Sequence, residues 1–177
     1  ATPDNAIFEL VSNYGGKAVL SSETHNTGTD RIFEVFKNTL KSLPNIIVNL
    51  QGDMPNIEPK IIKNLINYMQ QGKCEVGTLA SEIKNNFELE DENIVKVLVK
   101  EKLKEGIFSE ALDFLRVNPG QNHKTYHHVG IYAFTSIALT KYVSLKRSKL
   151  ELNRKLEQLR AMENGMSIHV GYINSSP

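Results

Sequence analysis

The chain has 177 residues, of which 40% are hydrophobic and 23% charged, and its formal net charge is +1 at pH 7. These values are typical of a globular domain with a buried core, and the near-neutral balance argues against nucleic acid and anionic membranes as partners. No apolar run is long enough to span a bilayer. The single cysteine, Cys74, excludes an internal disulfide framework and fits a reducing, cytoplasmic compartment.

The first half of the chain alternates helices with short strands. A cluster of helix-start residues at 3–5 predicts a helix that Gly15 and Gly16 stop. The elements predicted next, in chain order, are a strand over 17–20, a polar loop over 21–30, a helix over 31–43, a strand from Ile46, a helix over 58–70 and a strand over 76–83.

The second half begins with an acidic loop. Its predicted elements are this loop over 85–93, strands over 94–99 and 107–114, a polar loop over 117–124, a strand over 128–134, helices over 135–145 and 150–164, and a strand over 166–173. We therefore predict an α/β fold in a single domain over residues 1–177. Its central sheet is expected to be mixed and mostly parallel, with helices on both faces and a small antiparallel excursion where two strands follow one another.

Residues 45–55 read Asn-Ile-Ile-Val-Asn-Leu-Gln-Gly-Asp-Met-Pro and carry the strongest local signal. The β-branched run predicts a central strand buried on both faces, and Gln51, Gly52 and Asp53 follow its carboxyl end. Ligands bind at this end of strands in open α/β sheets, and a carboxylate there suits a divalent cation on a polyphosphate. A plain turn is the alternative, because Gly-Asp is also ordinary turn chemistry.

A second polar segment, residues 25–31, reads His-Asn-Thr-Gly-Thr-Asp-Arg. Thr29 or Asp30 is predicted to cap the helix that follows. The free N–H groups of that helix, together with Gly28 and Arg31, would then suit an anion or a nucleotide. Simple capping beside an exposed arginine is the alternative.

Two further groups of residues could contact a ligand. Strand alternation places His128, Gly130 and Tyr132 on one side, a polar shelf that suits a polyhydroxylated molecule. A half-buried histidine beside a partly buried tyrosine is the alternative there. In the helix over 150–164, Glu157 and Gln158 lie off the apolar stripe, where a solvated face is the simplest interpretation.

Taken together, several segments resemble the 3-deoxy-manno-octulosonate cytidylyltransferase (CMP-Kdo synthetase) family in order and spacing. The most specific is Val-Asn-Leu-Gln-Gly-Asp-Met-Pro at 48–55, which resembles the family's Val-Asn-Val-Gln-Gly-Asp-Glu-Pro. The others are residues 1–4, His-x-Thr-Gly-Thr-Asp-Arg at 25–31, Val-Lys-Val at 95–97, Ala-Leu-Asp-Phe-Leu-Arg at 111–116, His-Val-Gly-Ile-Tyr-Ala-Phe at 128–134 and Leu-Glu-Gln-Leu-Arg at 156–160.

The resemblance implies a Rossmann-like nucleotidyltransferase that transfers CMP from CTP to 3-deoxy-D-manno-octulosonate (Kdo), for lipopolysaccharide biosynthesis in the cytoplasm. It implies that Asp53 ligates Mg²⁺ on the CTP phosphates, and that Gly28, Thr29, Asp30 and Arg31 lie on the nucleotide side. It implies a sugar-acid pocket formed by Gln51, Arg116, His128, Tyr132, Glu157 and Gln158. It also implies a homodimer, with residues 128–159 near the partner.

The chain departs from the family pattern in several places. We expect it to lack both the family's N-terminal phosphate loop and its C-terminal segment with a second metal carboxylate, through truncation or omission of the ends. Met54 stands where the family has Glu, and Asp113 and Leu115 stand where it has Tyr and Ser. The alternatives to the Kdo enzyme are a CMP-sialate type cytidylyltransferase and a non-catalytic nucleotide-binding domain.

Overall fold

A computed structural model describes residues 1–39, 44–52, 54, 56–120 and 124–174. The chain divides into two compact units, residues 1–45 and residues 46–177, and each is described by itself. The first unit contains α1 (Asn5–Asn13) and α2 (Gly28–Thr39). Asp4 caps α1, because its carboxylate accepts hydrogen bonds from the N–H groups of Ala6 and Ile7.

Two predictions for the first unit need correction. The segment from Lys17 to Leu20 does not form a strand with a ladder, since its one described strand contact is a parallel bridge between Thr2 and Leu20. The second helix begins at Gly28, three residues earlier than expected, because Thr27 caps it. Thr27 Oγ1 accepts from the N–H of Asp30 at 3.2 Å and donates to the Asp30 carboxylate at 2.9 Å. The caps predicted at Thr29 or Asp30 are therefore wrong.

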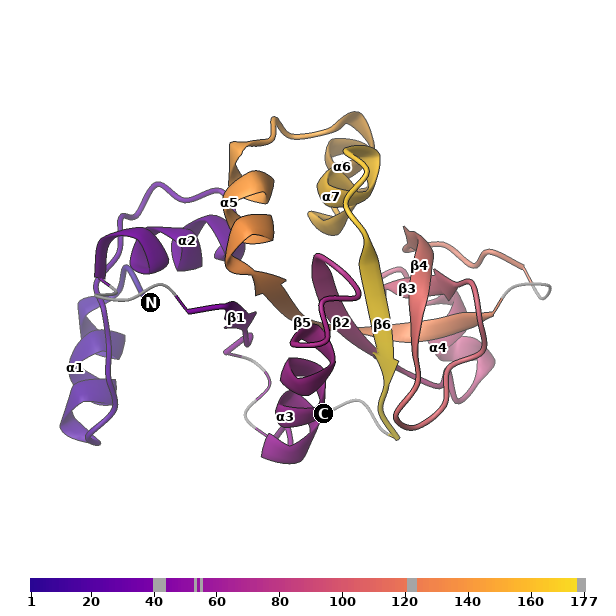
Figure 1. Cartoon of the computed structure of the whole chain (residues 1–177), viewed down its shortest axis with the longest axis horizontal. Coiled ribbons are helices and arrows are strands. Elements are labelled where there is room, and N and C mark those ends of the chain that lie inside the picture. The colour runs from indigo at the N-terminus through magenta and orange to yellow at the C-terminus, as the bar shows by residue number, and fades with distance from the viewer. Residues whose placement is uncertain (40–43, 53, 55, 121–123, 175–177) are drawn as a thin grey trace. The chain divides into compact units, whose positions relative to one another are not determined.

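The second unit is built on a six-stranded sheet. Its strands are β1 (Ile46–Asn49), β2 (Val76–Ser81), β3 (Lys96–Val99), β4 (Phe108–Leu115), β5 (Thr125–Thr135) and β6 (Ile168–Tyr172). They lie in the order β1-β5-β2-β6-β4-β3, and β3 also pairs with β5, which closes five of the strands into a ring. Figure 1 shows β5 and β6 crossing at the centre of this unit.

The sheet is mixed, as predicted, but "mostly parallel" is wrong for its ladders. Among the described strands, β2 and β6 are the one parallel pair, and the other pairs are antiparallel. The reason is β5, which runs between β1 and β2 in the opposite direction. Strands β1, β2, β3 and β6 do share one direction. The predicted antiparallel excursion is confirmed, because β3 and β4, which follow one another in the chain, pair antiparallel.

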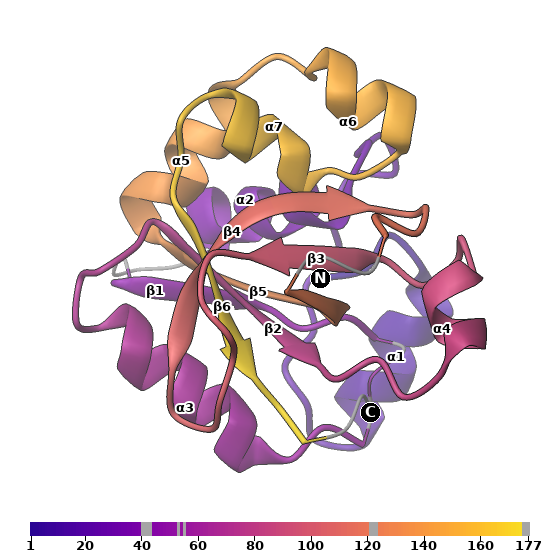
Figure 2. The ribbon, with the colours of Figure 1, turned by 90° about the vertical axis from the view of Figure 1, so that its right-hand side faces the viewer.

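Helices cover both faces of this sheet, as predicted (Figure 2). On one face α3 (Pro59–Met69) packs its buried Leu65 and Met69 against Leu79, Val129 and Ile131, which are among the residues of the main apolar core. The fit over β2 is close, because a Cβ on Gly77 would lie 2.7 Å from the Met69 sulfur. On the opposite face lie α5 (Ser136–Ser144), against β5 and β1, and α7 (Gln158–Glu163), against β4.

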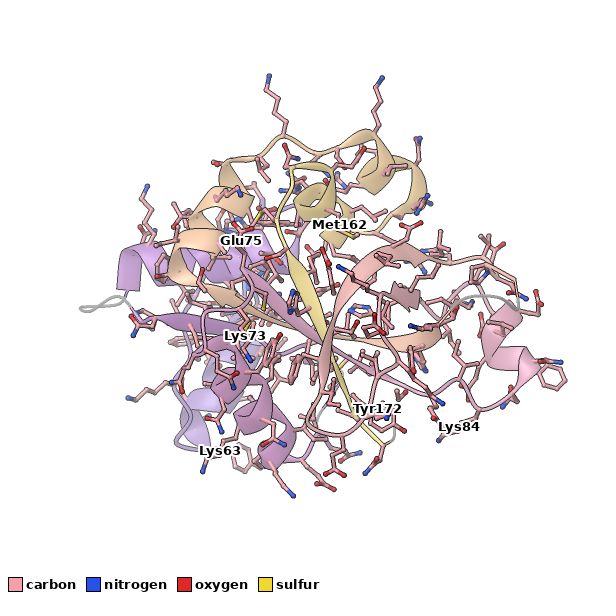
Figure 3. All side chains as sticks on the ribbon, turned by 45° about the vertical axis from the view of Figure 1, so that its right-hand side comes forward. Lys63, Lys73, Glu75, Lys84, Met162 and Tyr172 are labelled. Atoms are coloured by element: carbon pink, nitrogen blue, oxygen red, sulfur yellow. The ribbon has the colours of Figure 1, made fainter. Side chains whose placement is uncertain are left out.

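The start of β2 is fixed to the strand beside it through Glu75, which Figure 3 labels. One carboxylate oxygen of Glu75 accepts from the N–H of Ser167 at 3.0 Å, and the N–H of Glu75 donates to the Ser167 hydroxyl at 3.1 Å. Lys141 in α5 donates to the other carboxylate oxygen at 3.1 Å. These contacts set the register of β2 against β6 and attach α5 to the same point.

Three further expectations differ from the structure. The acidic loop over 85–93 contains a short helix, α4 (Asn86–Glu90), because Asn85 caps it by accepting from the N–H of Glu88. The helix over 150–164 is two helices, α6 (Lys149–Arg154) and α7, separated where Lys155 adopts a positive φ of 54°. Strand β1 lies at an edge of the described sheet with its three aliphatic residues half-buried, so it is not a central strand buried on both faces.

Candidate functional site

The sheet face that carries α5 and α7 presents His128 and Tyr132 together, as strand alternation predicts. Their ring centroids are 5.5 Å apart, and the two residues are 7% and 5% exposed. Phe114 of β4 packs edge-on to the His128 ring at 5.0 Å. Thr78 of β2 completes the group, with its hydroxyl oxygen 2.9 Å from Nε2 of His128. Three strands therefore fix the position of this imidazole.

Both polar side chains are held uncharged. Burial lowers the pKa of His128 to about 3, and the neighbouring His127 adds to the shift. Burial also raises the pKa of Tyr132, and the negative charge of Glu157 nearby contributes. At neutral pH the pair is therefore a neutral imidazole and a neutral phenol, groups that suit hydroxyls better than anions.

Arg116 lies just after β4 and is one of several cationic residues of this unit. Its Nε donates to the Arg154 carbonyl at 3.3 Å, one Nη to the Glu92 carbonyl at 3.0 Å and the other to the Lys155 carbonyl at 3.4 Å. These bonds use three of the five N–H donors of a guanidinium. Arg116 thus connects the end of β4 to the junction of α6 and α7, and its two other donors bond to none of the described residues.

Lys96 is a buried polar residue to which the sequence analysis gave no role. It is 0% exposed, and its ammonium donates to the Arg116 carbonyl at 2.8 Å and to the Asp91 carbonyl at 2.5 Å. Burial lowers the pKa of Lys96. One feature of the sequence could have indicated that Lys96 is buried. It interrupts the apolar run from Val95 to Val99, whose residues are expected to lie in the core and not at the surface.

Glu157 and Gln158 lie at the start of α7, and neither is on a solvated face. Gln158 is 6% exposed and Glu157 is half-buried, so the surface interpretation is wrong. The hydroxyl of Tyr142 in α5 donates to the Glu157 carbonyl at 3.0 Å. The guanidinium carbon of Arg160 lies 4.7 Å from the centroid of the Tyr142 ring, a cation–π contact between α7 and α5.

Arg160 is itself fixed by a buried ion pair with Glu151. Its Nε and one Nη donate to the two carboxylate oxygens at 2.8 and 2.7 Å, a two-point contact between residues that are 3% and 1% exposed. Burial alone would raise the pKa of Glu151, but hydrogen bonds from Arg160 and Arg147 lower it. The carboxylate therefore stays charged, and the network from Glu151 to Tyr142 holds the start of α7 in place.

The segment after β1 approaches the same strand, β5. Asn49, the last residue of β1, is opposite Tyr132 in the ladder, and the amide of Gln51 donates to the Asn49 side chain at 3.1 Å. A Cβ on Gly130 would lie 3.7 Å from the methyl group of Met54. Asp53, the predicted metal ligand, lies outside the described residues.

Gly28, Thr29, Asp30 and Arg31 belong to the first unit, at the start of α2. Thr29 is 1% exposed. Arg31 donates to the Ser21 hydroxyl at 2.5 Å and to the Ser22 carbonyl at 2.8 Å. Arg31 therefore stabilises the loop before α2. The other predicted ligand residues lie in the second unit, except Asp53, which is outside the described residues.

The described part of the chain lacks two further features. No cluster of three or more His, Cys, Asp or Glu side chains within it could hold a metal ion. None of its helices is long and apolar enough to cross a membrane.

The known proteins that are similar to this chain in sequence are cytidylyltransferases. The sequence profile described as cytidylyltransferase matches residues 1–168. The 3-deoxy-manno-octulosonate cytidylyltransferase of Paramagnetospirillum magneticum is 36% identical over 179 residues, which cover 100% of this chain and 72% of that protein. The protein of the same name from Rhodopseudomonas palustris strain BisB5 is 39% identical over 180 residues, with coverage of 100% and 72%.

Solved structures give the same result. CMP:2-keto-3-deoxy-manno-octonic acid synthetase complexed with CTP matches with a TM-score of 0.85 and 32% identity, covering 97% of this chain and 70% of that chain. The 4-diphosphocytidyl-2C-methyl-D-erythritol synthase of Anaerococcus prevotii has a TM-score of 0.54 at 14% identity, which supports the α/β nucleotidyltransferase fold alone. The chain therefore belongs to the cytidylyltransferase family, in the group of the 3-deoxy-manno-octulosonate cytidylyltransferases.

Proposed function

We propose that this protein transfers CMP from CTP to Kdo, releasing pyrophosphate and forming CMP-Kdo. The observation that carries the proposal is the relatives' agreement over the whole chain, with a related structure bound to CTP. The buried, uncharged pair of His128 and Tyr132 supports it from chemistry, because such a pair suits a polyhydroxylated sugar acid. The product would serve lipopolysaccharide biosynthesis in the cytoplasm.

The reaction is a nucleotidyl transfer. The anomeric hydroxyl of the sugar acid attacks the α-phosphorus of CTP in line with the leaving pyrophosphate. The bond from the sugar oxygen to phosphorus forms, the bond from phosphorus to the bridging oxygen breaks, and the hydroxyl proton is released to solvent. Because little covalent chemistry falls to the protein, its contribution is positioning and charge neutralisation.

Each predicted sugar-acid residue of the second unit has a part in this positioning. Arg116, with two donors beyond its carbonyl contacts, binds the sugar carboxylate. His128, Tyr132 and the polar ends of Glu157 and Gln158 bind the sugar hydroxyls. Gln51 orients the sugar from the end of β1, where it is held by Asn49.

The nucleotide and the metal are assigned to two further segments of the chain. Gly28, Thr29, Asp30 and Arg31 lie on the CTP side. Asp53 would supply a carboxylate ligand to Mg²⁺, a hard oxygen donor that suits this ion. When bound, Mg²⁺ would neutralise charge on the triphosphate. Residues 1–177 form one nucleotidyltransferase domain that pairs with a second copy through the region of residues 128–159.

Pyrophosphate release tests the activity. With CTP, Mg²⁺ and Kdo, the intact gene product should release pyrophosphate and form CMP-Kdo in equal amounts. Release with a sialic acid but not with Kdo would identify the CMP-sialate type instead. CTP binding without release under either condition would identify a non-catalytic nucleotide-binding domain.

The metal assignment has its own test. Asp53→Asn should abolish turnover and leave the thermal unfolding temperature unchanged, because it removes a charge and keeps the side-chain shape. Glu105→Gln, the same loss of charge at an exposed turn residue, is the control and should keep full activity. Near-normal turnover of Asp53→Asn, or activity that persists in excess EDTA, would remove Asp53 and Mg²⁺ from the proposal.

A further inference from the structure

Thr78 is a fully buried hydroxyl at the point where the ladder between β2 and β5 is irregular. Thr78 is opposite Tyr132, but the next residue, Leu79, is opposite Val129, so Gly130 and Ile131 have no opposite residues in β2. The Thr78 side chain lies in this gap. Its Oγ1 is 2.7 Å from the Ile131 carbonyl and 3.3 Å from the Val129 carbonyl.

These contacts decide where the hydroxyl hydrogen points. A threonine hydroxyl has one hydrogen to donate, and a carbonyl oxygen can only accept. At 2.7 Å the pair of oxygens needs that hydrogen between them, so Thr78 donates to Ile131. The third contact of Oγ1, with Nε2 of His128 at 2.9 Å, must then be a hydrogen bond that Thr78 accepts and the imidazole donates.

The other ring nitrogen follows by elimination. His128 is neutral at physiological pH, so its ring carries one N–H, and Nε2 has it. Nδ1 is therefore an acceptor, and it makes no hydrogen bond to any described residue. None of the described residues has a fully buried side-chain nitrogen or oxygen without a partner, so Nδ1 must lie at the 7% of His128 that remains accessible.

We infer that Thr78 is a positioning residue that holds His128 as the Nε2–H tautomer, so that Nδ1 accepts a hydrogen bond from a hydroxyl of the sugar acid. The inference deepens the proposed function and rests on it for the identity of the ligand. Phe114 and Tyr132, at ring distances of 5.0 and 5.5 Å, keep the imidazole plane fixed while the hydrogen bond fixes its protonated edge.

This tautomer also orients the substrate. An unprotonated nitrogen repels carboxylate oxygens and attracts a hydroxyl hydrogen, whereas a charged imidazolium would do the reverse. The sugar carboxylate is thereby directed away from His128 and toward the guanidinium of Arg116. The two residues discriminate between the two ends of a molecule that carries both kinds of group.

Nitrogen NMR of protein labelled with ¹⁵N-histidine tests the tautomer directly. In long-range ¹H–¹⁵N spectra, Nε2 of His128 should resonate as a protonated nitrogen and Nδ1 as an unprotonated one, with His128→Gln used for assignment. Thr78→Val, which keeps the shape but has no acceptor, should move the ring to the Nδ1–H form or to a mixture. Thr78→Ser should restore the wild-type spectrum.

Kinetics supply the second measurement. Thr78→Val should raise the KM for Kdo by about tenfold, the equivalent of one hydrogen bond, with the KM for CTP unchanged. Thr78→Ser should restore the KM for Kdo. Thr140→Val, which removes an exposed hydroxyl that bonds only within α5, is the matched control and should change neither constant.

The outcomes separate the two proposals. A protonated Nδ1 in the wild-type protein would overturn the inference, and wild-type spectra decide this even if Thr78→Val does not fold. A Thr78→Val protein with an unchanged tautomer and unchanged KM for Kdo would overturn it as well. If the wild-type protein has the predicted tautomer but does not convert Kdo, the proposed function is refuted. Thr78 would still be the residue that holds His128 as the Nε2–H tautomer.

Discussion

Nη2 of Arg116 donates to the carbonyl of Lys155, and Lys155 is the one non-glycine residue with a positive φ among the described residues. A lysine in this conformation costs about 1 kcal/mol relative to glycine. Arg116 holds the carbonyls of both Arg154 and Lys155, so it stabilises the bend that separates α6 from α7. The residue proposed to bind the sugar carboxylate therefore also sets the position of Glu157 and Gln158.

Replacing Arg116 should affect substrate and structure together. Arg116→Gln removes the charge and at least two of the three carbonyl contacts, so the KM for Kdo should rise by at least about tenfold. Amide hydrogen exchange over residues 153–158 should become faster in the same variant. Lys63→Gln is the control, because Lys63 is an exposed cation on α3 and takes no part in the contacts around the bend. Normal exchange rates with a raised KM would assign Arg116 to substrate binding alone.

Lys155 offers a test of the bend itself. Lys155→Gly should leave the free energy of unfolding unchanged or raise it by up to about 1 kcal/mol, because glycine adopts a positive φ without strain. Lys155→Val should lower it by about 1–2 kcal/mol, since a β-branched residue is poorly tolerated there. Urea unfolding followed by circular dichroism measures both. A Gly variant less stable than the Val variant would contradict the positive φ.

Lys96 should matter for stability through the carbonyls that it holds. Lys96→Met fills the same volume but leaves the carbonyls of Asp91 and Arg116 without this donor, so the free energy of unfolding should fall by about 1–3 kcal/mol. Lys100→Met is the matched control, because Lys100 is exposed and its ion pair with Glu110 lies in solvent. Equal unfolding midpoints for the two variants would show that the buried ammonium contributes nothing net.

His128 gives a prediction for pH. Its pKa of about 3 in the folded protein is below the ordinary histidine pKa of 6.5, so between these values the unfolded chain binds more protons than the folded one. Stability should therefore fall as pH decreases through this window, by about 1.4 kcal/mol per pH unit from this residue. Urea unfolding of His128→Asn should show a pH slope smaller by that amount. Identical slopes for the two proteins would mean that His128 is not held neutral by burial.

Local signals in the sequence were sufficient for most element types. The apolar spacing of the third helix, the β-branched run at Ile46 and the alternation from His128 each predicted the element that forms. The sequence also contains Asn85 and Glu88, the capping pair of α4. This helix is not predicted, because the acidic composition of the segment indicates a loop. The family motif then gave the activity, which spacing alone did not.

What sequence reasoning missed depends on contacts distant in the chain. No Gly or Pro marks the bend at Lys155, because Arg116, 39 residues earlier, stabilises it. The burial of Gln158 depends on packing against other elements, which helical periodicity does not report. Likewise, the spacing of helices and strands carries no information on whether β5 enters the sheet between β1 and β2 or at its edge.

The central placement of β5 has a consequence for the order in which the protein matures. Ile46 in β1 pairs with Thr135 in β5, a separation of 89 residues. Strands β2 and β3 also pair with β5, which follows both of them in the chain. During synthesis, β1, β2 and β3 therefore leave the ribosome before the strand that joins them exists. We expect nascent chains that end before Thr135 to bind chaperones and to be degraded readily by proteases, with resistance to proteolysis gained only after β5 emerges.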